Sequence, residues 1–477
     1  MLAERTQIIA FFALIFGVYV MMIPMEHTAD AYGYAAAMGR GELWSPHHLL
    51  YQPWTLALSQ LWLWTGVEPI FLYSLMNSLA MVLSLLVVYE LLPQRIDRRW
   101  WVVVVAFCFA TLRFGTENET YAWPLFFSLW GTERLMNGNG FLAAFLLAVA
   151  VLFHQIHLFW CLALCVYAWR TGRWQFKWFY LGLLASAALV VYVYSELAVQ
   201  QGYSLWMYAT HDAQEGLVDF RWGPKAIALS LINLVRSFVQ VHASTLALFD
   251  TPWILVFVLA GLLMGSGLLV GIKPRAFQKA MWNRPFVWVL LFQFAFAVFS
   301  QGNAEFMVMI PVLLVLEWAQ QYRRQTHWPI VALGLGLALW NGATLLASKK
   351  LQASSFVVDR MSDLRQIDAQ MESKPFVYVA RDKVLLDNYM DYKKISIPNL
   401  EIWKAPGYGA QREEVNKVLL ENHRNIPIFI DAKQVVGRQT RADWLGADGY
   451  NNWISDWAWD PSPIAGLKGW WVLRRKP

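Results

Sequence analysis

The stretch IIAFFALIFGVYVMMIPMEHTADAYGY, residues 8–34, decides the fold. Its first part, Ile8–Pro24, is an apolar run of the length that a helix needs to cross a lipid bilayer. A polar segment with Glu26, His27 and Asp30 follows at once. We therefore predict a retained membrane span that leads directly into an acidic loop at one membrane surface.

Apolar runs of this kind recur as far as Leu346 and predict a polytopic α-helical membrane protein with about eleven transmembrane helices. Of the 477 residues, 57% are hydrophobic and 15% are charged, whereas soluble domains have about 25% charged residues. A soluble globular protein is thereby excluded. Residues 141–169 fit either one long tilted helix or two short helices that meet at His154–His157. We place the spans near 8–24, 70–92, 100–113, 121–136, 141–155, 157–169, 178–198, 253–271, 285–300, 305–320 and 328–347.

The three cysteines all lie inside apolar segments, so we expect buried thiols and no disulfide framework; they are Cys108, Cys161 and Cys165.

The loops differ in charge according to the side on which they fall. About fourteen Lys and Arg fall on the side of the N-terminus and about two, Arg40 and Arg221, on the other side. This asymmetry predicts a cytoplasmic N-terminus, and we expect a bacterial inner (plasma) membrane protein. The net charge of +6 then reflects short cytoplasmic loops and not a nucleic-acid partner. Residues 225–248 include Lys225 and Arg236, and we expect them to lie along the outer interface.

The composition changes near residue 350. Residues 1–349 form the predicted transmembrane module, and residues 350–477 read as a small soluble α/β domain outside the membrane. Four tryptophans of this domain lie among Asp, Asn and Gly, where they fit either sugar binding or docking. They are Trp444, Trp453, Trp457 and Trp459. The expected strands are Phe376–Ala380, Ile426–Ile430 and Trp470–Leu473, and the expected helices are Ser354–Met371 and Gln411–Asn422.

Carboxylates and histidines gather on the predicted outer side. Asp30 precedes a helical pattern whose N-terminus would hold the carboxylate ionised. Glu117 and Glu119 lie between two apolar runs, and buried acids are costly unless they serve a site. We expect Glu119 to be the more important of the two, because it is closer to the next span.

The histidines form two pairs, His47–His48 and His154–His157. The i, i+3 spacing of the second pair puts both rings on one helix face. No metal-binding motif accompanies them, so we assign no metal ligands, and we favour structural or substrate-binding roles. Carboxylates on neighbouring loops can share a divalent cation, and the sequence leaves binding of Mg or Mn open.

Together these residues resemble the GT-C superfamily of integral-membrane glycosyltransferases. The first motif is Thr28-Ala29-Asp30-x-Tyr32-x-Tyr34, and the second is Gly115-Thr116-Glu117-Asn118-Glu119-Thr120-Tyr121. Asn303-Ala304-Glu305-Phe306 with Pro311 is a faint echo of a third, without its His, Lys and Arg. The paired Asp-x-Asp or Asp-Glu of many members is missing from the first loop, and this leaves metal dependence open.

The resemblance implies transfer of a sugar from a polyprenyl-phosphate donor, of the dolichyl or undecaprenyl type, to a glycan, lipid or protein acceptor. It implies Asp30 as the general base and Glu119 as a second catalytic carboxylate residue. It also implies inversion of configuration at the sugar carbon. Fixed positive charge must stabilise the departing phosphate. The substrate-binding residues that we expect are Tyr34, His47, His48, Glu117, His154, His157, Arg221, Arg236 and Glu305.

Three other functions remain open at this point. A flippase of lipid-linked glycans would need polar residues through the midplane and pseudo-symmetric repeats, and the sequence contains no evident repeat. A glycan polymerase or ligase differs from the transferase mainly in its acceptor. A membrane acyltransferase would use a histidine inside a span, such as His154 or His157.

Overall fold

The computed structural model describes thirteen stretches of the chain: residues 2–172, 176–211, 223–241, 248–271, 282–300, 303–322, 327–351, 356–372, 374–380, 383–404, 426–431, 457–461 and 470–475. The chain divides into two compact units. The first unit comprises Met1–Pro24 and Arg40–Lys350, and the second comprises Met25–Gly39 and Leu351–Pro477. The division near residue 350 lies where the composition changes, but residues 25–39 pack with the second unit.

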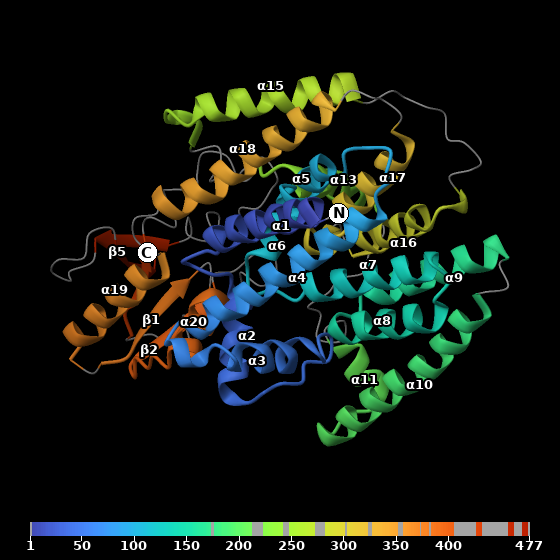
Figure 1. Cartoon of the computed structure of the whole chain (residues 1–477). Coiled ribbons are helices and arrows are strands. Elements are labelled where there is room, and N and C mark those ends of the chain that lie inside the picture. The colour runs from blue at the N-terminus through green and yellow to red at the C-terminus, as the bar shows by residue number, and fades with distance from the viewer. Residues whose placement is uncertain are drawn as a thin grey trace. The chain divides into compact units, whose positions relative to one another are not determined.

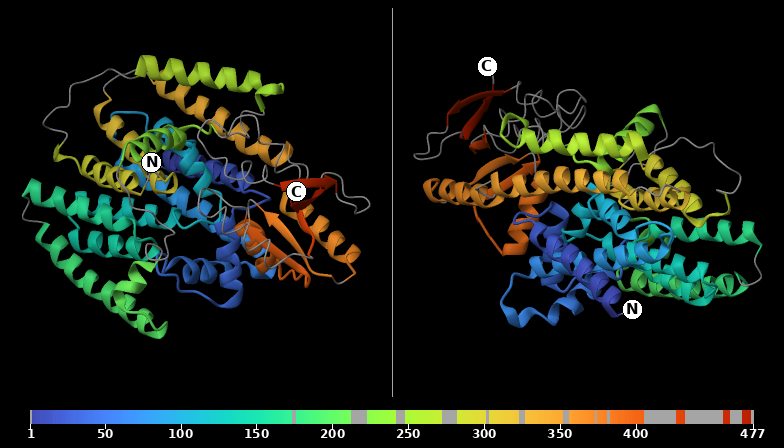
Figure 2. Two further views of the ribbon diagram at one scale, coloured as in Figure 1. Left: turned by 180° about the vertical axis from the view of Figure 1, so that it is seen from behind. Right: turned by 45° about the horizontal axis from the view of Figure 1, so that its top comes forward.

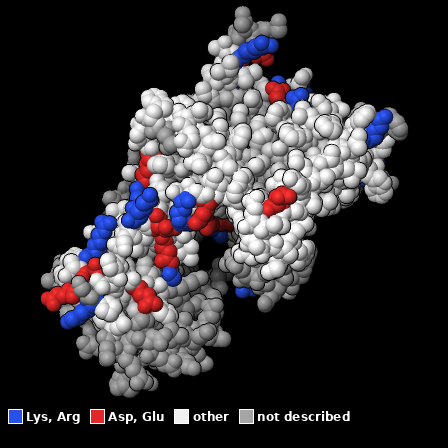
Figure 3. Space-filling model, turned by 90° about the horizontal axis from the view of Figure 1, so that it is seen from below, with Lys and Arg blue, Asp and Glu red and all other residues white. Residues whose placement is uncertain are grey.

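Five of the described helices are long and apolar enough to cross a membrane. Several of their leucines face outward, with Leu14, Leu184 and Leu262 exposing 68%, 71% and 67% of their surface. Such exposure is costly in water and costs nothing in lipid. Charged side chains are also sparse over most of the face seen in Figure 3. The chain is therefore an integral membrane protein. The five helices are α1 (Leu2–Met22), α4 (Pro69–Leu91), α10 (Lys177–Gln200), α15 (Ile254–Gly271) and α18 (Trp328–Leu351).

The shorter helices of the first unit lie among and beside these spans (Figure 1). They are α3 (Tyr51–Gln60), α5 (Arg98–Ala106), α6 (Phe109–Gly115), α7 (Ala122–Met136), α8 (Gly140–Phe153), α9 (His157–Thr171), α11 (Leu205–Ala209), α13 (Pro224–Phe238), α16 (Pro285–Phe299) and α17 (Ile310–Gln321), with the 3-10 turns η1 (Leu63–Thr65), η3 (Leu248–Asp250) and η5 (Glu305–Met307).

Most predicted spans coincide with helices, and two of them differ. The predicted span 100–113 is two short helices, because Cys108 is extended (φ −58°, ψ 140°) and starts α6 as its N-cap. The predicted span 305–320 becomes an α-helix only at Ile310. Residues 141–169 form two helices, with His154 extended at the end of α8. The number of membrane crossings stays a prediction.

Helices α15 and α18 lie side by side in both views of Figure 2. Glycines permit this approach. A Cβ on Gly336 would lie 2.8 Å from Ala260 O, and a Cβ on Gly267 would lie 2.5 Å from Pro329 O. Small residues are the usual means of close helix packing in membranes, where dispersion contacts replace the hydrophobic effect.

The second unit contains a five-stranded sheet in the order β2-β1-β3-β5-β4. Strand β1 is parallel to β2 and β3, and β5 is antiparallel to β3 and β4. The strands are β1 (Phe376–Ala380), β2 (Leu400–Lys404), β3 (Ile428–Asp431), β4 (Trp457–Pro461) and β5 (Trp470–Arg475), and the helices are α2 (Ala29–Arg40, its last residue in the first unit), α19 (Phe356–Gln370) and α20 (Lys383–Lys393).

The prediction of a helical membrane protein with a small C-terminal α/β domain is confirmed. The three predicted strands correspond to β1, β3 and β5. The sequence reading missed β2 and β4, which are the two edge strands. Edge strands accept charged residues and proline, and both occur here, at Glu401 and Pro461. The predicted helix Gln411–Asn422 lies outside the described residues.

Candidate functional site

The acidic loop between α6 and α7 is buried. Glu117 exposes 0% of its surface, Asn118 0% and Glu119 4%. A buried carboxylate is costly unless a cation or hydrogen-bond donors compensate it. Arg113, one helical turn before Glu117, places Nη1 2.9 Å from Glu117 Oε2. The first acid is thereby neutralised by a local ion pair.

Two side chains from other helices hold this loop in place. Asn77, inside α4, donates from Nδ2 to the main-chain oxygens of Glu117 (2.8 Å) and Glu119 (2.6 Å). Tyr51, at the start of α3, donates from its hydroxyl to Asn118 Oδ1 at 2.6 Å. Burial raises the pKa of the Tyr51 phenol well above its ordinary value, and the nearby Glu119 raises it further. The tyrosine therefore stays protonated and remains a donor.

Sequence reasoning missed Asn77 and Tyr51 as parts of the site. Asn77 did carry a signal, because a polar amide inside an apolar span calls for a buried partner. The identity of that partner was not visible, since Glu119 lies 42 residues further along the chain.

The next part of the cluster is aromatic. The ring of His154 lies between two others, with centroids 4.5 Å from His48 and 5.0 Å from Tyr121. The hydroxyl of Tyr121 donates to Glu305 Oε2 at 3.2 Å. Predicted residues from three separate stretches of sequence therefore meet in one place. Because Tyr121 directly follows the acidic loop, this aromatic group and the acidic loop are one continuous polar cluster.

His47 is held by a hydrogen-bond network centred on Gln155, which we call the Gln155 hub. Its Nδ1 lies 2.9 Å from Gln155 Oε1, and Gln155 Nε2 donates to Pro46 O and to Tyr194 OH, both at 3.0 Å. The tyrosine hydroxyl in turn donates to Pro46 O at 3.0 Å. Gln155 belongs to the break between α8 and α9, so it fixes residues 46–48 to that break.

His157 is joined to this cluster through its main-chain nitrogen, which donates to His154 O at 3.1 Å, and its side chain makes other contacts. Its Nδ1 is 2.7 Å from Ser128 Oγ on α7, and its ring stacks on Trp160 with centroids 5.9 Å apart. The side chain is fully buried. These contacts join α7 to α9, and the substrate-binding role of His157 stays a prediction.

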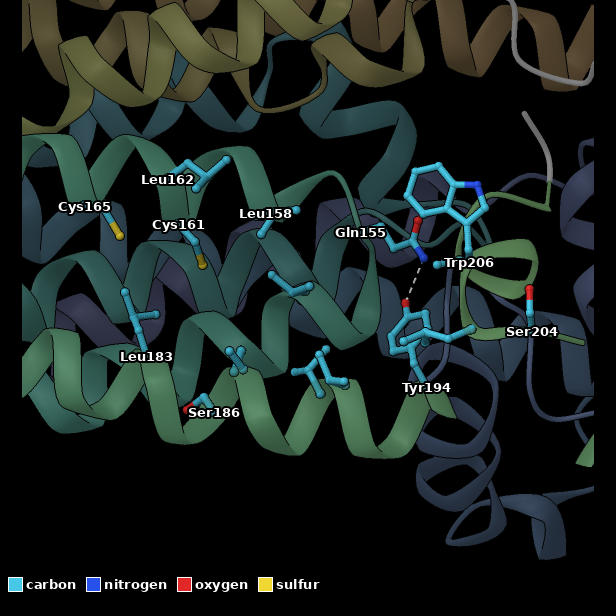
Figure 4. Close-up of a pocket in the computed structure, with 17 residues that line it drawn as sticks. Gln155, Leu158, Cys161, Leu162, Cys165, Leu183, Ser186, Tyr194, Ser204 and Trp206 are labelled. Carbon is cyan, nitrogen blue, oxygen red and sulfur yellow. Dashed lines mark hydrogen bonds between the residues drawn. The ribbon is translucent and has the colours of Figure 1, made fainter. Parts of the chain in front are cut away.

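An apolar cavity of about 900 Å³ opens between α8, α9, α10 and α11. Apolar side chains such as Val151, Leu158 and Val190 make most of its wall. Its polar lining includes Gln155 and Tyr194, the pair joined by the hydrogen bond drawn in Figure 4. The cavity therefore reaches the hub that holds His47, at the edge of the polar cluster.

Asp30 and Tyr34 lie on α2, in the second unit. Asp30 is exposed, and no hydrogen bond or ion pair joins its carboxyl to another residue that the structure describes. Partial desolvation by the surrounding protein raises its pKa above the ordinary 3.8. Asp30 and Glu119 belong to different units, and their convergence on one reacting centre stays a prediction.

Of the two predicted phosphate ligands, Arg221 lies outside the described residues. Arg236 is half-buried near the end of α13, where its Nη1 donates to Asn233 Oδ1 at 2.9 Å. Within the described stretches, no three His, Cys, Asp or Glu side chains are placed to hold a metal ion. Whether the protein binds a divalent cation therefore stays an open question.

Two solved structures are similar to this chain. The crystal structure of ArnT from Cupriavidus metallidurans in the apo state is 11% identical, with a TM-score of 0.46 over 99% of this chain and 98% of that one. The structure of the same protein bound to undecaprenyl phosphate is 12% identical, with a TM-score of 0.47 over 98% of each chain. No protein-family model and no curated protein matches the sequence. Because both TM-scores are below 0.5, we take the function from the chain's own residues.

Proposed function

We propose that the protein is a membrane glycosyltransferase that moves a sugar from a polyprenyl-phosphate donor to an acceptor on the outer face of the membrane. One observation carries the proposal: an apolar cavity between membrane helices reaches, at Gln155, a buried cluster of acids and histidines. A lipid-linked sugar has the same two parts, a hydrocarbon chain and a polar reacting head. The cavity would take the chain, and the cluster would face the head.

In the proposed reaction an acceptor hydroxyl attacks the anomeric carbon as the bond from that carbon to the phosphate oxygen breaks. The carboxylate of Asp30 takes the hydroxyl proton, and the polyprenyl phosphate leaves with the bonding electrons. A single displacement inverts the configuration of the sugar. Arg236 and Arg221 are proposed for the developing phosphate charge, while Arg113 already neutralises Glu117.

The cluster serves the sugar rather than the lipid in this proposal. Neutral and acidic oxygens of Glu119, Glu305 and Tyr121 are suited to sugar hydroxyls, which both donate and accept hydrogen bonds. His48 and His154 add flat rings against which a pyranose can pack. The buried ion pair and the Asn77 amide keep these groups in place before the substrate arrives, which lowers the ordering cost at binding.

The donor half of the proposal is tested with undecaprenyl phosphate as the probe. Native mass spectrometry would measure its binding to the purified chain in nanodiscs, with a phosphatidylglycerol of ordinary acyl length for comparison. Ala187, on α10, lines the cavity, and Ala188 is exposed and does not line it. We expect Ala187→Trp to weaken binding of the polyprenyl lipid by about tenfold or more, and Ala188→Trp to leave it unchanged. Equal binding by the two variants would remove the cavity from the proposal.

The chemical half is tested in a strain that lacks the gene. Mass spectrometry of its glycolipids and glycans identifies the product that disappears, and the purified chain is then assayed with the corresponding lipid-linked sugar. Asp30→Asn keeps the size of the side chain and removes the base, so we expect loss of turnover with retained lipid binding. Wild-type turnover by Asp30→Asn would exclude the proposed role of Asp30.

A further inference from the structure

Helix α2, which carries Asp30, is held by the C-terminal domain at three points. The first is at Glu26, just before the helix. Its Oε1 accepts a hydrogen bond of 2.8 Å from the main-chain nitrogen of Val357, in the first turn of α19. Unpaired main-chain N–H groups at a helix N-terminus favour a carboxylate. Glu26 thus joins the start of α19 to the segment that leads into α2.

The second point is Asn388, on α20. Its Nδ2 donates to Ala29 O at 2.9 Å, directly before Asp30. The same nitrogen would lie 2.9 Å from a Cβ at position 33. The absence of a side chain at Gly33 therefore lets α20 approach α2 closely. Asn388 touches α2 both one residue before Asp30 and one turn after it.

The third point is aromatic. The ring of Tyr32 makes an edge contact with Tyr389, with centroids 5.1 Å apart, and lies 5.8 Å from Tyr392. Both partners are on α20, which stands beside α2 in Figure 1. Edge-to-face packing is a favoured geometry for aromatic pairs and stabilises them beyond the area that they bury. Tyr32 is itself buried, so this face of α2 belongs to the core of the second unit.

These contacts matter because α2 is short and rich in Ala and Gly. A helix of about twelve residues is marginal without tertiary packing. Asp30 has no side-chain partner among the described residues, so the place of its carboxylate depends on the main chain of α2. That main chain is fixed by α20.

We propose that Asn388 is a positioning residue for Asp30, and that the C-terminal domain serves the reaction by holding the helix that presents the base. The inference rests on the proposed role of Asp30. It gives the C-terminal domain a function that does not depend on its tryptophans. It also explains why residues 25–39, although they follow the first span directly, pack with a domain that begins more than 300 residues later.

The first test compares two asparagines of the same unit. Asn388→Ala removes the bond to Ala29 O on α2, and Asn399→Ala removes a similar bond, of 3.0 Å, to Asp368 Oδ1 on α19. We expect Asn388→Ala to lower kcat by about tenfold while KM for the donor stays the same, because the base is misplaced and the lipid site is intact. Asn399→Ala should keep the wild-type kcat. Equal kcat in the two variants would overturn the proposal.

The second test locks the contact. A Cβ at position 33 would lie 3.4 Å from Asn388 Cγ, so cysteine side chains at positions 33 and 388 would be close enough to form a disulfide. Gly33→Cys with Asn388→Cys should form a disulfide on oxidation, measured by peptide mass spectrometry. The reduced form lacks the bond from Asn388 to Ala29 O and should be slow, and oxidation, which holds α2 against α20 again, should raise its turnover. Loss of turnover on oxidation would show that α2 must leave α20 during the reaction, and would refute the inference. Disulfide formation reports docking even if Asp30→Asn proves active, so the two failures are distinguishable.

Discussion

Replacing Asn77 by leucine should open the acidic loop. The change keeps the branching and the number of side-chain heavy atoms on α4, and it removes the two bonds to the oxygens of Glu117 and Glu119. A buried carbonyl that loses its partner costs about 1–3 kcal/mol. Glu117 O still accepts from the main-chain nitrogen of Glu119 at 3.0 Å, so its share of the cost is small. We expect a total of about 2–3 kcal/mol, which raises the open population of the loop about 30- to 150-fold.

A thiol at position 120 would report this opening. Thr120 is 1% exposed, and Thr120→Cys is introduced into a chain whose three native cysteines are replaced by alanine. The rate of modification by N-ethylmaleimide, read by intact mass, then follows the open population. The matched control is Ser84→Ala, also buried on α4, where the Ser84 hydroxyl donates to Ala80 O of its own helix. If Asn77→Leu and Ser84→Ala react at the same rate, Asn77 does not hold the loop.

Three further predictions concern charge, pH and packing. Arg113→Leu leaves Glu117 buried without its cation and should destabilise the chain by about 3 kcal/mol. The double variant Arg113→Leu with Glu117→Leu should recover most of the melting temperature, measured in detergent. No recovery would contradict the ion pair. Because the pKa of Asp30 is raised, a base at this position stays protonated to a higher pH than an ordinary aspartate, so turnover should fall with decreasing pH along a limb that lies above 3.8. The raised pKa also means that ionisation of Asp30 disfavours the fold as pH rises, so Asp30→Asn should melt at or above the wild-type temperature at neutral pH. Gly336→Leu should lower the melting temperature by forcing α18 away from Ala260 O, while substitution at Gly261, which has open space around it, should not.

The sequence predicted the helical segments well, because a span needs a long apolar run and such runs are visible residue by residue. It failed where a run contains a local break. Residues 100–113 are apolar throughout except for Thr111 and Arg113, but the extended conformation of Cys108 divides them. The sequence prediction also failed at the edge strands β2 and β4, because their polar residues and proline interrupt the alternation of apolar and polar residues. Local patterns therefore predict elements, and they do not predict the breaks that tertiary contacts impose.

The candidate site could be predicted only in part. Glu117, Glu119, His48, His154 and Glu305 were selected as polar interruptions of an apolar chain, and all five lie in or beside the described cluster. What the sequence could not show is how each one is held.

The partners of these residues lie far along the chain. Tyr121 contacts Glu305 across 184 residues, and Ala29 contacts Asn388 across 359. The second contact places α2 with the C-terminal domain, where the sequence pattern had joined it to the first span. Such contacts depend on long-range packing, and local sequence patterns do not predict them.

The polar cluster is difficult to explain as a stabilising feature. Apolar residues of equal volume replace a buried ion pair with little loss and often with a gain of about 1–4 kcal/mol. A membrane protein rich in leucine and valine could fill the space around Glu117 with such residues. Here the same space contains an ion pair with Arg113, a buried amide at Asn77 and a tyrosine held protonated at position 51. If the double leucine variant of Arg113 and Glu117 melts as the wild type does and yet fails to turn over substrate, the cluster contributes chemistry that the fold itself does not need.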